Sequence, residues 1–234
     1  MFKLIFSILP FICLLLPNFW VNYILRKYNN TLPDMPFTGR QIGNLILKDI
    51  KIDTVSIESI KLIDHYDPLE KKIKISDDKL DKKSITSISV VAHEIGHAIQ
   101  DIENYKPLIL RQKLIEKTLL FQKIGSFLLI IGLPSIFAFT KSPFVTLISA
   151  IIIMGCLSTN ALIHLITLPV EIDASFKRAL PILKKYVPNE NMKQCKSVLR
   201  AAAFTYLAQS IFSIFRLKVI LFSFINIFKS IIKR

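Results

Sequence analysis

The chain has 234 residues, of which 52% are hydrophobic, and a formal net charge of +14. An apolar fraction this large, gathered in long blocks, argues against an ordinary soluble domain and favours membrane segments around one small polar unit. The basic excess lies beside the apolar blocks, with five basic residues in the tail after residue 204, so it suits lipid headgroups and argues against a nucleic-acid partner.

The first apolar run, Leu4–Leu25, is predicted to be a retained membrane span. It is not followed by the small-residue cleavage site of a signal peptide. Trp20 lies near its end, and Arg26 and Lys27 follow directly, which is typical of an aromatic belt with basic anchors. The run is therefore expected to anchor the chain in a membrane.

The polar segment that follows predicts a small α/β unit. Hydrophobic residues recur there first with a helical period and then with the alternation of strands. The second strand is expected to offer an exposed edge on which a peptide substrate could lie as an added strand. The expected elements are a helix over 39–48 capped by Thr38, strands over 55–60 and 72–75, a turn over 64–68, and a helix over 84–104 that ends before Pro107.

Two further apolar runs, Ile124–Phe139 and Phe144–Leu168, predict a membrane-spanning helical hairpin. A last run covers about 201–228 and is interrupted by Arg216 and Lys218. Because charges within a span are costly, this run either spans once or breaks into an interfacial helix and a second short piece. The sequence leaves both arrangements open.

The two polar segments are expected on one side of the membrane, because a helical hairpin returns the chain to the side that it left. Their basic residues near the membrane predict that this side is the cytoplasm, in a multi-pass membrane protein. The expected domains are a transmembrane anchor (1–25), a catalytic segment (26–122), a transmembrane hairpin (123–168), a second polar helical segment (169–203) and a C-terminal membrane segment with a basic tail (204–234).

The helix predicted over 84–104 carries the pattern His93-Glu94-x-x-His97. The two histidines lie one turn apart, so both imidazoles project from the same face and can take two corners of a zinc tetrahedron. Glu94 is then positioned to accept a proton from an attacking water and to pass it to the leaving amine. The pattern also occurs by chance in unrelated helices, but here Glu94 is the one charged residue between 84 and 100, and a lone buried carboxylate is costly without a metal or another partner.

A catalytic zinc needs a third ligand and an open position. Glu171 and Asp173 follow the third apolar run and are the two candidates. Because they are two positions apart, they face different ways on a helix, so one can bind metal while the other orients a histidine or caps the helix. Both could instead belong to a solvated first turn, since Pro169 is expected to begin a new helix there.

His65 and Tyr66 lie in the turn predicted over 64–68. Either side chain is a candidate donor to the oxyanion of a tetrahedral intermediate. The alternative is turn chemistry, with the tyrosine ring packed on a strand.

Two strings together resemble the neutral zinc metallopeptidases of bacterial membranes, the YugP-like family. They are HEIGHAIQ at residues 93–100 and LPVEIDAS at residues 168–175. Residues 64–68 and 104–111 are also similar to that family, and the likeness extends over roughly residues 38–203. The tail departs from it, because charged residues interrupt its apolar run.

The resemblance implies a gluzincin-like arrangement with one Zn²⁺ per chain. His93, His97 and Glu171 match the metal positions, and Glu94 matches the catalytic position. The implied fold is a mainly α, multi-span membrane protein with a small α/β zincin-like catalytic unit.

The function expected is therefore that of a membrane-embedded zinc metallopeptidase that cleaves peptides or proteins at or near the membrane surface. The alternative is a catalytically silent membrane scaffold that binds metal. An intramembrane protease of the site-2 type and a transporter fit less well, because the apolar spans contain no carboxylate.

Overall fold

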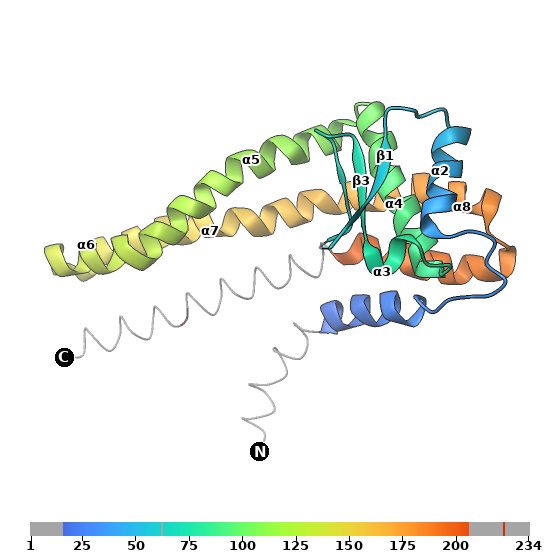
Figure 1. The fold of residues 1–234 in the computed structure, drawn as a ribbon. Helices are drawn as coiled ribbons and strands as arrows, with labels where there is room; N and C mark the ends of the chain where they lie inside the picture. Colours follow the sequence, from blue (N-terminus) through green and yellow to red (C-terminus); the bar gives the residue numbers. More distant parts are fainter. Residues whose placement is uncertain (1–15, 62, 206–221, 223–234) are drawn as a thin grey trace, which may run out of the picture. The chain divides into compact units, whose positions relative to one another are not determined.

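The computed structural model describes residues 16–61, 63–205 and 222, and these are mainly helical with one small sheet (Figure 1). The chain divides into two compact units. The sheet unit comprises Leu16–Ile109 and Thr167–Thr205, and the described part of the hairpin unit is Leu110–Ile166 with Phe222. The elements are α2 (Gly39–Asp49), β1 (Ser56–Ile60), β2 (His65–Asp67), β3 (Lys72–Ser76), α3 (Asp77–Leu80), α4 (Ile85–Ile102), α5 (Lys106–Phe127), the π-helical turn η1 (Leu128–Gly132), α6 (Leu133–Thr140), α7 (Pro143–Ile172), the π-helical turn η2 (Asp173–Ala179), α8 (Leu180–Tyr186) and the 3-10 turn η3 (Asn189–Asn191). Residues 16–27 and 192–205 are also helical.

Helix α2 begins where the sequence predicts. The Thr38 hydroxyl accepts a hydrogen bond from the Gln41 backbone N–H at 3.2 Å, and the Gln41 side chain accepts one from the Thr38 backbone N–H at 2.9 Å. This capping box satisfies two backbone donors that the first helical turn leaves unpaired. The helix buries Ile42 and Ile46 in the core of the sheet unit.

The sheet has the strand order β1-β3-β2, with β1 parallel and β2 antiparallel to β3. The turn predicted over 64–68 is wrong, because His65–Asp67 pairs with β3 as a strand and the tight turn lies at 68–71. The exposed edge predicted for β3 is also wrong. That strand is central, paired on both sides, and its residues Ile73 and Ile75 are fully buried.

Helix α4 forms the centre of the sheet unit. Ser84 caps it by accepting a hydrogen bond from the Ser87 backbone N–H at 3.0 Å, and the helix ends at Ile102, close to the predicted bounds. It contacts α2 and η2 as well as strands β2 and β3 (Figure 1). Nearly all of its residues are therefore buried, including the polar ones.

Pro169 does not begin a new helix as predicted. It lies inside α7, which continues through η2 into α8. A proline within a helix removes one backbone hydrogen bond. Contacts with α4 hold the segment helical despite that loss, because Val170 is fully buried and its carbonyl accepts a hydrogen bond from the Gln100 side chain at 2.9 Å.

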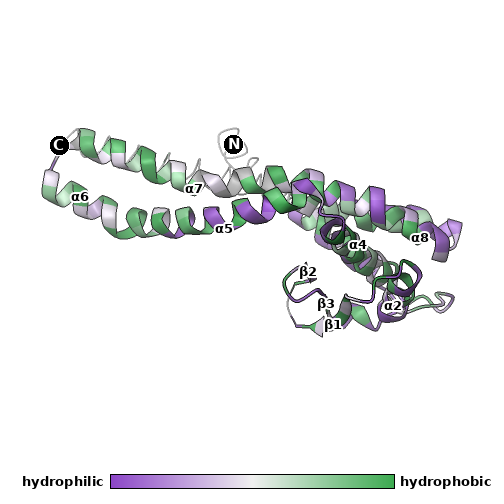
Figure 2. Ribbon diagram, turned by 90° about the horizontal axis from the view of Figure 1, so that it is seen from above, coloured by the Kyte–Doolittle hydropathy of each residue, from purple (hydrophilic) through white to green (hydrophobic). Residues whose placement is uncertain are grey.

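The hairpin unit carries the apolar helices, which are seen as the mostly green ribbons α5, α6 and α7 in Figure 2. Among the described residues, one helical stretch, Lys106–Thr140, is long and apolar enough to cross a membrane, and 11% of its most apolar window is buried. Phe144–Leu157 is a shorter apolar helix. Of the expected multi-span arrangement, the described part of the chain thus supplies one candidate span. The spans predicted over 4–25 and 201–228 fall mostly outside the described residues.

Candidate metal centre

Two turns of α4 and the end of α7 bring together three side chains that the sequence predicts as metal ligands. The Nε2 atom of His93 lies 3.1 Å from Oε2 of Glu171, and the Nε2 atom of His97 lies 3.2 Å from the same oxygen. The two imidazole rings meet edge to face with centroids 4.7 Å apart. All three side chains are buried, and one ligand atom of each lies within 4.8 Å of the others.

The other ring nitrogen of each histidine is also engaged. Nδ1 of His93 lies 2.9 Å from the hydroxyl of Ser175, and Nδ1 of His97 lies 2.9 Å from the side-chain oxygen of Gln100. These contacts fix both rings so that the Nε2 atoms face Glu171. Outer partners of this kind are typical of metal-binding histidines.

Close approach of the two helical segments allows this convergence. Gly96 lies between the two histidines on α4, and a Cβ at this position would stand 2.6 Å from the carbonyl oxygen of Ala174 on η2. The absence of a side chain lets the backbones of α4 and η2 come into contact. Glu171, at the end of α7, and Ser175, one turn later on η2, can then both reach the histidines.

The three side chains fit a zinc ion. Two imidazoles and one carboxylate are the ligand set of many catalytic zinc sites, which leave a fourth position open. Two ligand atoms at about 2.05 Å from zinc and at a tetrahedral angle are about 3.3 Å apart. The observed separations of 3.1 and 3.2 Å between imidazole nitrogen and carboxylate oxygen are close to that value.

The charge state of Glu171 suits a ligand. Burial alone raises the pKa of its carboxyl group, but the charge of His97 and hydrogen bonds from both histidines outweigh burial and hold the pKa well below its ordinary value. Glu171 is therefore a carboxylate at neutral pH, the form that binds metal.

Glu94 is buried beside this group but is not one of its three members. Burial raises the pKa of its carboxyl group, and the carboxylates of Glu171 and Asp64 raise it further, while the two histidines oppose the shift. A carboxyl group with a raised pKa holds a proton more readily than an exposed glutamate does. This property suits a group that must accept and then release a proton.

Asp173, the rival to Glu171 as third ligand, lies elsewhere. Its Oδ2 atom accepts hydrogen bonds from Nε2 of Gln100 at 2.8 Å and from Nε of Arg178 at 2.7 Å. Among the described residues, the group of candidate metal ligands contains Glu171 and not Asp173.

The candidate oxyanion donors His65 and Tyr66 are on strand β2, which contacts α4. The Tyr66 hydroxyl donates a hydrogen bond to Asp101 of α4 at 2.7 Å, and Nδ1 of His65 lies 2.8 Å from the backbone carbonyl oxygen of Ile63. Burial, followed by the hydrogen bond to Asp101, raises the pKa of Tyr66 well above its ordinary value, so its hydroxyl keeps its proton.

The sequence pattern predicts no role for Gln100, Ser175 or Arg178, although each contacts one of the three candidate ligands or a residue that helps to hold one in place. Periodicity carries a signal for two of them. Gln100 follows His97 by three positions, and Ser175 follows Glu171 by four, so each shares a helix face with a predicted ligand. Arg178 carries no comparable signal, because it reaches Asp173 across the widened turn η2.

Comparison with known proteins points in the same direction. A family model described as "Putative neutral zinc metallopeptidase" matches residues 3–225. The chain is 30% identical over 220 residues to "Putative membrane protease YugP" of Bacillus subtilis (strain 168), a match that covers 89% of this chain and 92% of that protein. No solved structure matches the chain. The family's description implies zinc, which is the ion that the His93, His97 and Glu171 group fits, and the chain belongs to this zinc metallopeptidase family.

Proposed function

We propose that this protein is a membrane-embedded, zinc-dependent peptidase that hydrolyses peptide bonds at or near the membrane surface. The observation that carries the proposal is the convergence of His93, His97 and Glu171, with the buried carboxyl group of Glu94 on the same helix as the histidines. Family membership supports the same activity.

The proposed division of labour follows from the chemistry of each side chain. His93, His97 and Glu171 would hold one Zn²⁺, which when bound polarises the scissile carbonyl and makes a water nucleophilic near neutral pH. Glu94 accepts the proton of the attacking water and delivers it to the leaving amine. Because its pKa is raised, the carboxylate of Glu94 accepts a proton more readily near neutral pH than an ordinary glutamate does.

The oxyanion role of His65 or Tyr66 stays a prediction. Each side chain would have to act from strand β2, which contacts the helix α4 that carries His93 and His97. The hydroxyl hydrogen of Tyr66 is directed to Asp101, so it would reach a substrate only after leaving that carboxylate. Tyr66 also helps to attach β2 to α4 through this bond.

We also propose that the lipid bilayer surrounds the apolar helices and that the catalytic side is cytoplasmic. The candidate span supports the first part, since most of its apolar window is exposed to the surroundings. The second part rests on charge. Five basic residues lie between positions 106 and 123 of the span, near the end that follows α4, whereas Lys141 alone follows the far end.

Four variants test the proposal in purified protein in detergent. We expect about one zinc per chain in the wild type and in Glu94→Gln, and loss of zinc in His97→Ala and Glu171→Ala. Hydrolysis of unfolded casein should fall about 10²- to 10⁴-fold in Glu94→Gln, because the general base is lost while the metal stays. Glu58→Gln, the same chemical change on the exposed strand β1, serves as the control and should leave both quantities unchanged.

Each contrary outcome has a distinct meaning. Zinc that persists in Glu171→Ala would move the third ligand to another residue. A zinc-loaded wild type with no hydrolysis beyond that of Glu94→Gln would point to a silent metal-binding scaffold. A wild type that binds no zinc after resupply would refute the metallopeptidase proposal.

A further inference from the structure

Gln100 has no exposed surface and lies one helical turn beyond His97 on α4. Its side-chain amide makes three contacts. The nitrogen donates to the backbone carbonyl of Val170 at 2.9 Å and to the carboxylate of Asp173 at 2.8 Å. The oxygen lies 2.9 Å from Nδ1 of His97.

These contacts settle the orientation of the amide. Both neighbours of its nitrogen are pure acceptors, a carbonyl oxygen and a carboxylate oxygen, so each needs one of the two amide hydrogens. The flipped amide would place its oxygen against two other acceptor oxygens, so the amide oxygen and the Val170 carbonyl would lose this hydrogen bond in a buried site, which is unfavourable. The amide oxygen must therefore face His97.

The orientation of Gln100 in turn decides the tautomer of His97. An amide oxygen can only accept a hydrogen bond, so Nδ1 of the imidazole must donate one. In the metal-free protein Nε2 is hydrogen-bonded to Glu171, and when a metal takes the place of that proton the ring is neutral and Nε2 offers the metal a lone pair. That lone pair is directed toward the position that His93 and Glu171 also face.

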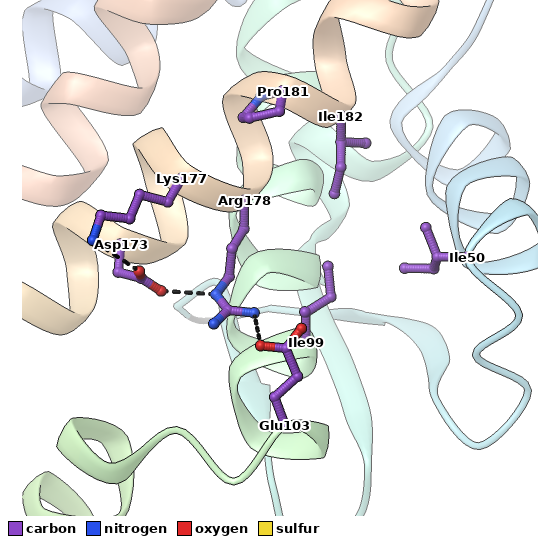
Figure 3. Close-up of a pocket in the computed structure, with 8 residues that line it drawn as sticks. All are labelled: Ile50, Ile99, Glu103, Asp173, Lys177, Arg178, Pro181 and Ile182. Carbon is purple, nitrogen blue, oxygen red and sulfur yellow. Dashed lines mark hydrogen bonds and ion pairs between the residues drawn. The ribbon is translucent and has the colours of Figure 1, made fainter.

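The far side of Gln100 is held by a second set of charges. The carboxylate of Asp173 accepts from Nε of Arg178 at 2.7 Å, and the same guanidinium donates to Glu103 at 2.8 Å. Figure 3 shows Arg178 between the two carboxylates at a surface hollow beside α4. A continuous chain of polar contacts therefore runs from the surface through Asp173 and Gln100 to His97.

We propose that Gln100 is a positioning residue for the metal centre, and that Asp173 acts through Gln100 rather than as a metal ligand. Gln100 holds His97 in the tautomer and orientation that metal binding needs, and Asp173 with Arg178 holds Gln100. This assignment rests on the proposed function, since it concerns the same zinc ion.

Zinc affinity, measured by competition with a chromophoric chelator, tests the assignment without relying on activity. Gln100→Leu replaces the amide with an apolar side chain of similar size that neither donates nor accepts a hydrogen bond. We expect the zinc affinity of this variant to fall about 10- to 100-fold. Ser89→Ala, which alters another buried polar residue of α4, is the control and should bind zinc as the wild type does.

A reversed pair distinguishes positioning from simple support of the fold. Gln100→Glu alone sets a second carboxylate against Asp173 and should weaken zinc binding strongly. Gln100→Glu combined with Asp173→Asn lets the new amide at position 173 donate to the new carboxylate, which still accepts from Nδ1 of His97. We expect the double variant to recover part of the lost affinity. The Val170 carbonyl stays unpaired and Nε of Arg178 loses the oxygen that it shares with Gln100 in the wild type, so the melting temperature stays below that of the wild type.

Nuclear magnetic resonance of zinc-loaded protein with ¹⁵N-labelled histidine supplies a spectroscopic readout. In the wild type and the double variant, the Nδ1–H proton of His97 should be shifted downfield and exchange slowly, and in Gln100→Leu it should exchange fast. If Gln100→Leu keeps both the wild-type affinity and the slow proton, the assignment is overturned and the peptidase proposal stands. If the wild type binds no zinc, both are overturned.

Discussion

Gly96 is the residue at which the fold and the metal centre depend on the same atom-scale contact. A Cβ there would stand 2.6 Å from the Ala174 carbonyl oxygen and 3.2 Å from the Ala174 Cα. Both atoms belong to backbone, which cannot rotate away as the end of a side chain could. The segment that carries Glu171 would have to move away from α4.

Gly96→Ala is therefore expected to destabilise the protein, although alanine favours helices. Overpacking of a buried contact costs about 1–3 kcal/mol, more than the gain of about 1 kcal/mol from replacing a helical glycine. Zinc affinity should fall as well, because Glu171 moves away from both histidines. The matched control is Gly155→Ala in α7, where a Cβ meets nothing within 4 Å. Thermal unfolding and zinc titration of both variants check this, and a Gly96→Ala protein as stable as its control would refute it.

At the scale of single residues, the sequence predicted those features of the site that depend only on the period of one helix. The i and i+4 spacing of His93 and His97 predicted two imidazoles on one face, and the structure has them there. The hydrogen bonds of Gln100 were out of reach, because its partners Val170 and Asp173 lie on a segment that only the tertiary fold brings against α4. The choice between Glu171 and Asp173 as third ligand depends on that same packing. The spacing of the two residues left the choice open, and the resemblance to the zinc metallopeptidase family favoured Glu171.

Among the described elements, the helical stretch Lys106–Thr140 is the one that is long and apolar enough to cross a membrane. Its apolar window is largely exposed, and Ile130 in its middle has 72% of its surface accessible. Such a surface would be costly in water and is suited to lipid.

Ile130→Lys is expected to release the protein partly from membranes. A lysine near the middle of a span raises the free energy of insertion by about 2.5–3.5 kcal/mol. The fraction left in the membrane pellet after alkaline extraction should fall, whereas Glu116→Lys, at the basic end of the same stretch, should leave it unchanged. Equal retention of both variants would contradict the proposal that this stretch lies in the bilayer.

Element prediction failed where tertiary packing outweighed local preference. Residues 64–68 have the composition of a turn, yet His65–Asp67 forms a strand because β3 supplies hydrogen-bonding partners. Pro169 has the position of a helix start, yet α7 continues through it because burial of Val170 and Glu171 holds the segment. The capped start of α2 was predicted correctly, since a capping box is a local signal.

For the molecule as a whole, a metal would join two segments that are distant in sequence. His97 and Glu171 are 74 positions apart. A ligand that binds the folded state alone stabilises it by mass action, by about 2.7 kcal/mol at a concentration one hundred times its Kd. Zinc should therefore stabilise the sheet unit in addition to the catalytic role proposed for it.

Removal of metal is expected to lower the melting temperature by about 5–10 °C, since 1 kcal/mol corresponds to about 2–4 °C in a chain of this size. Thermal unfolding with and without a strong chelator measures the shift, and added zinc should reverse it. His97→Ala should melt at the same temperature in both conditions. A wild type indifferent to the chelator would show that metal adds nothing to its stability.

The separation of the ligands also sets an order of events during biosynthesis. The ribosome releases α4, with both histidines and Glu94, well before it reaches Glu171, and the whole apolar hairpin is translated in between. A nascent chain at that stage holds two of the three proposed ligands, and the third, Glu171, arrives only on the helix that ends the hairpin. Under the proposed function, the order of translation would thus leave the new chain without its third zinc ligand, and so without peptidase activity, until its hairpin has been synthesised.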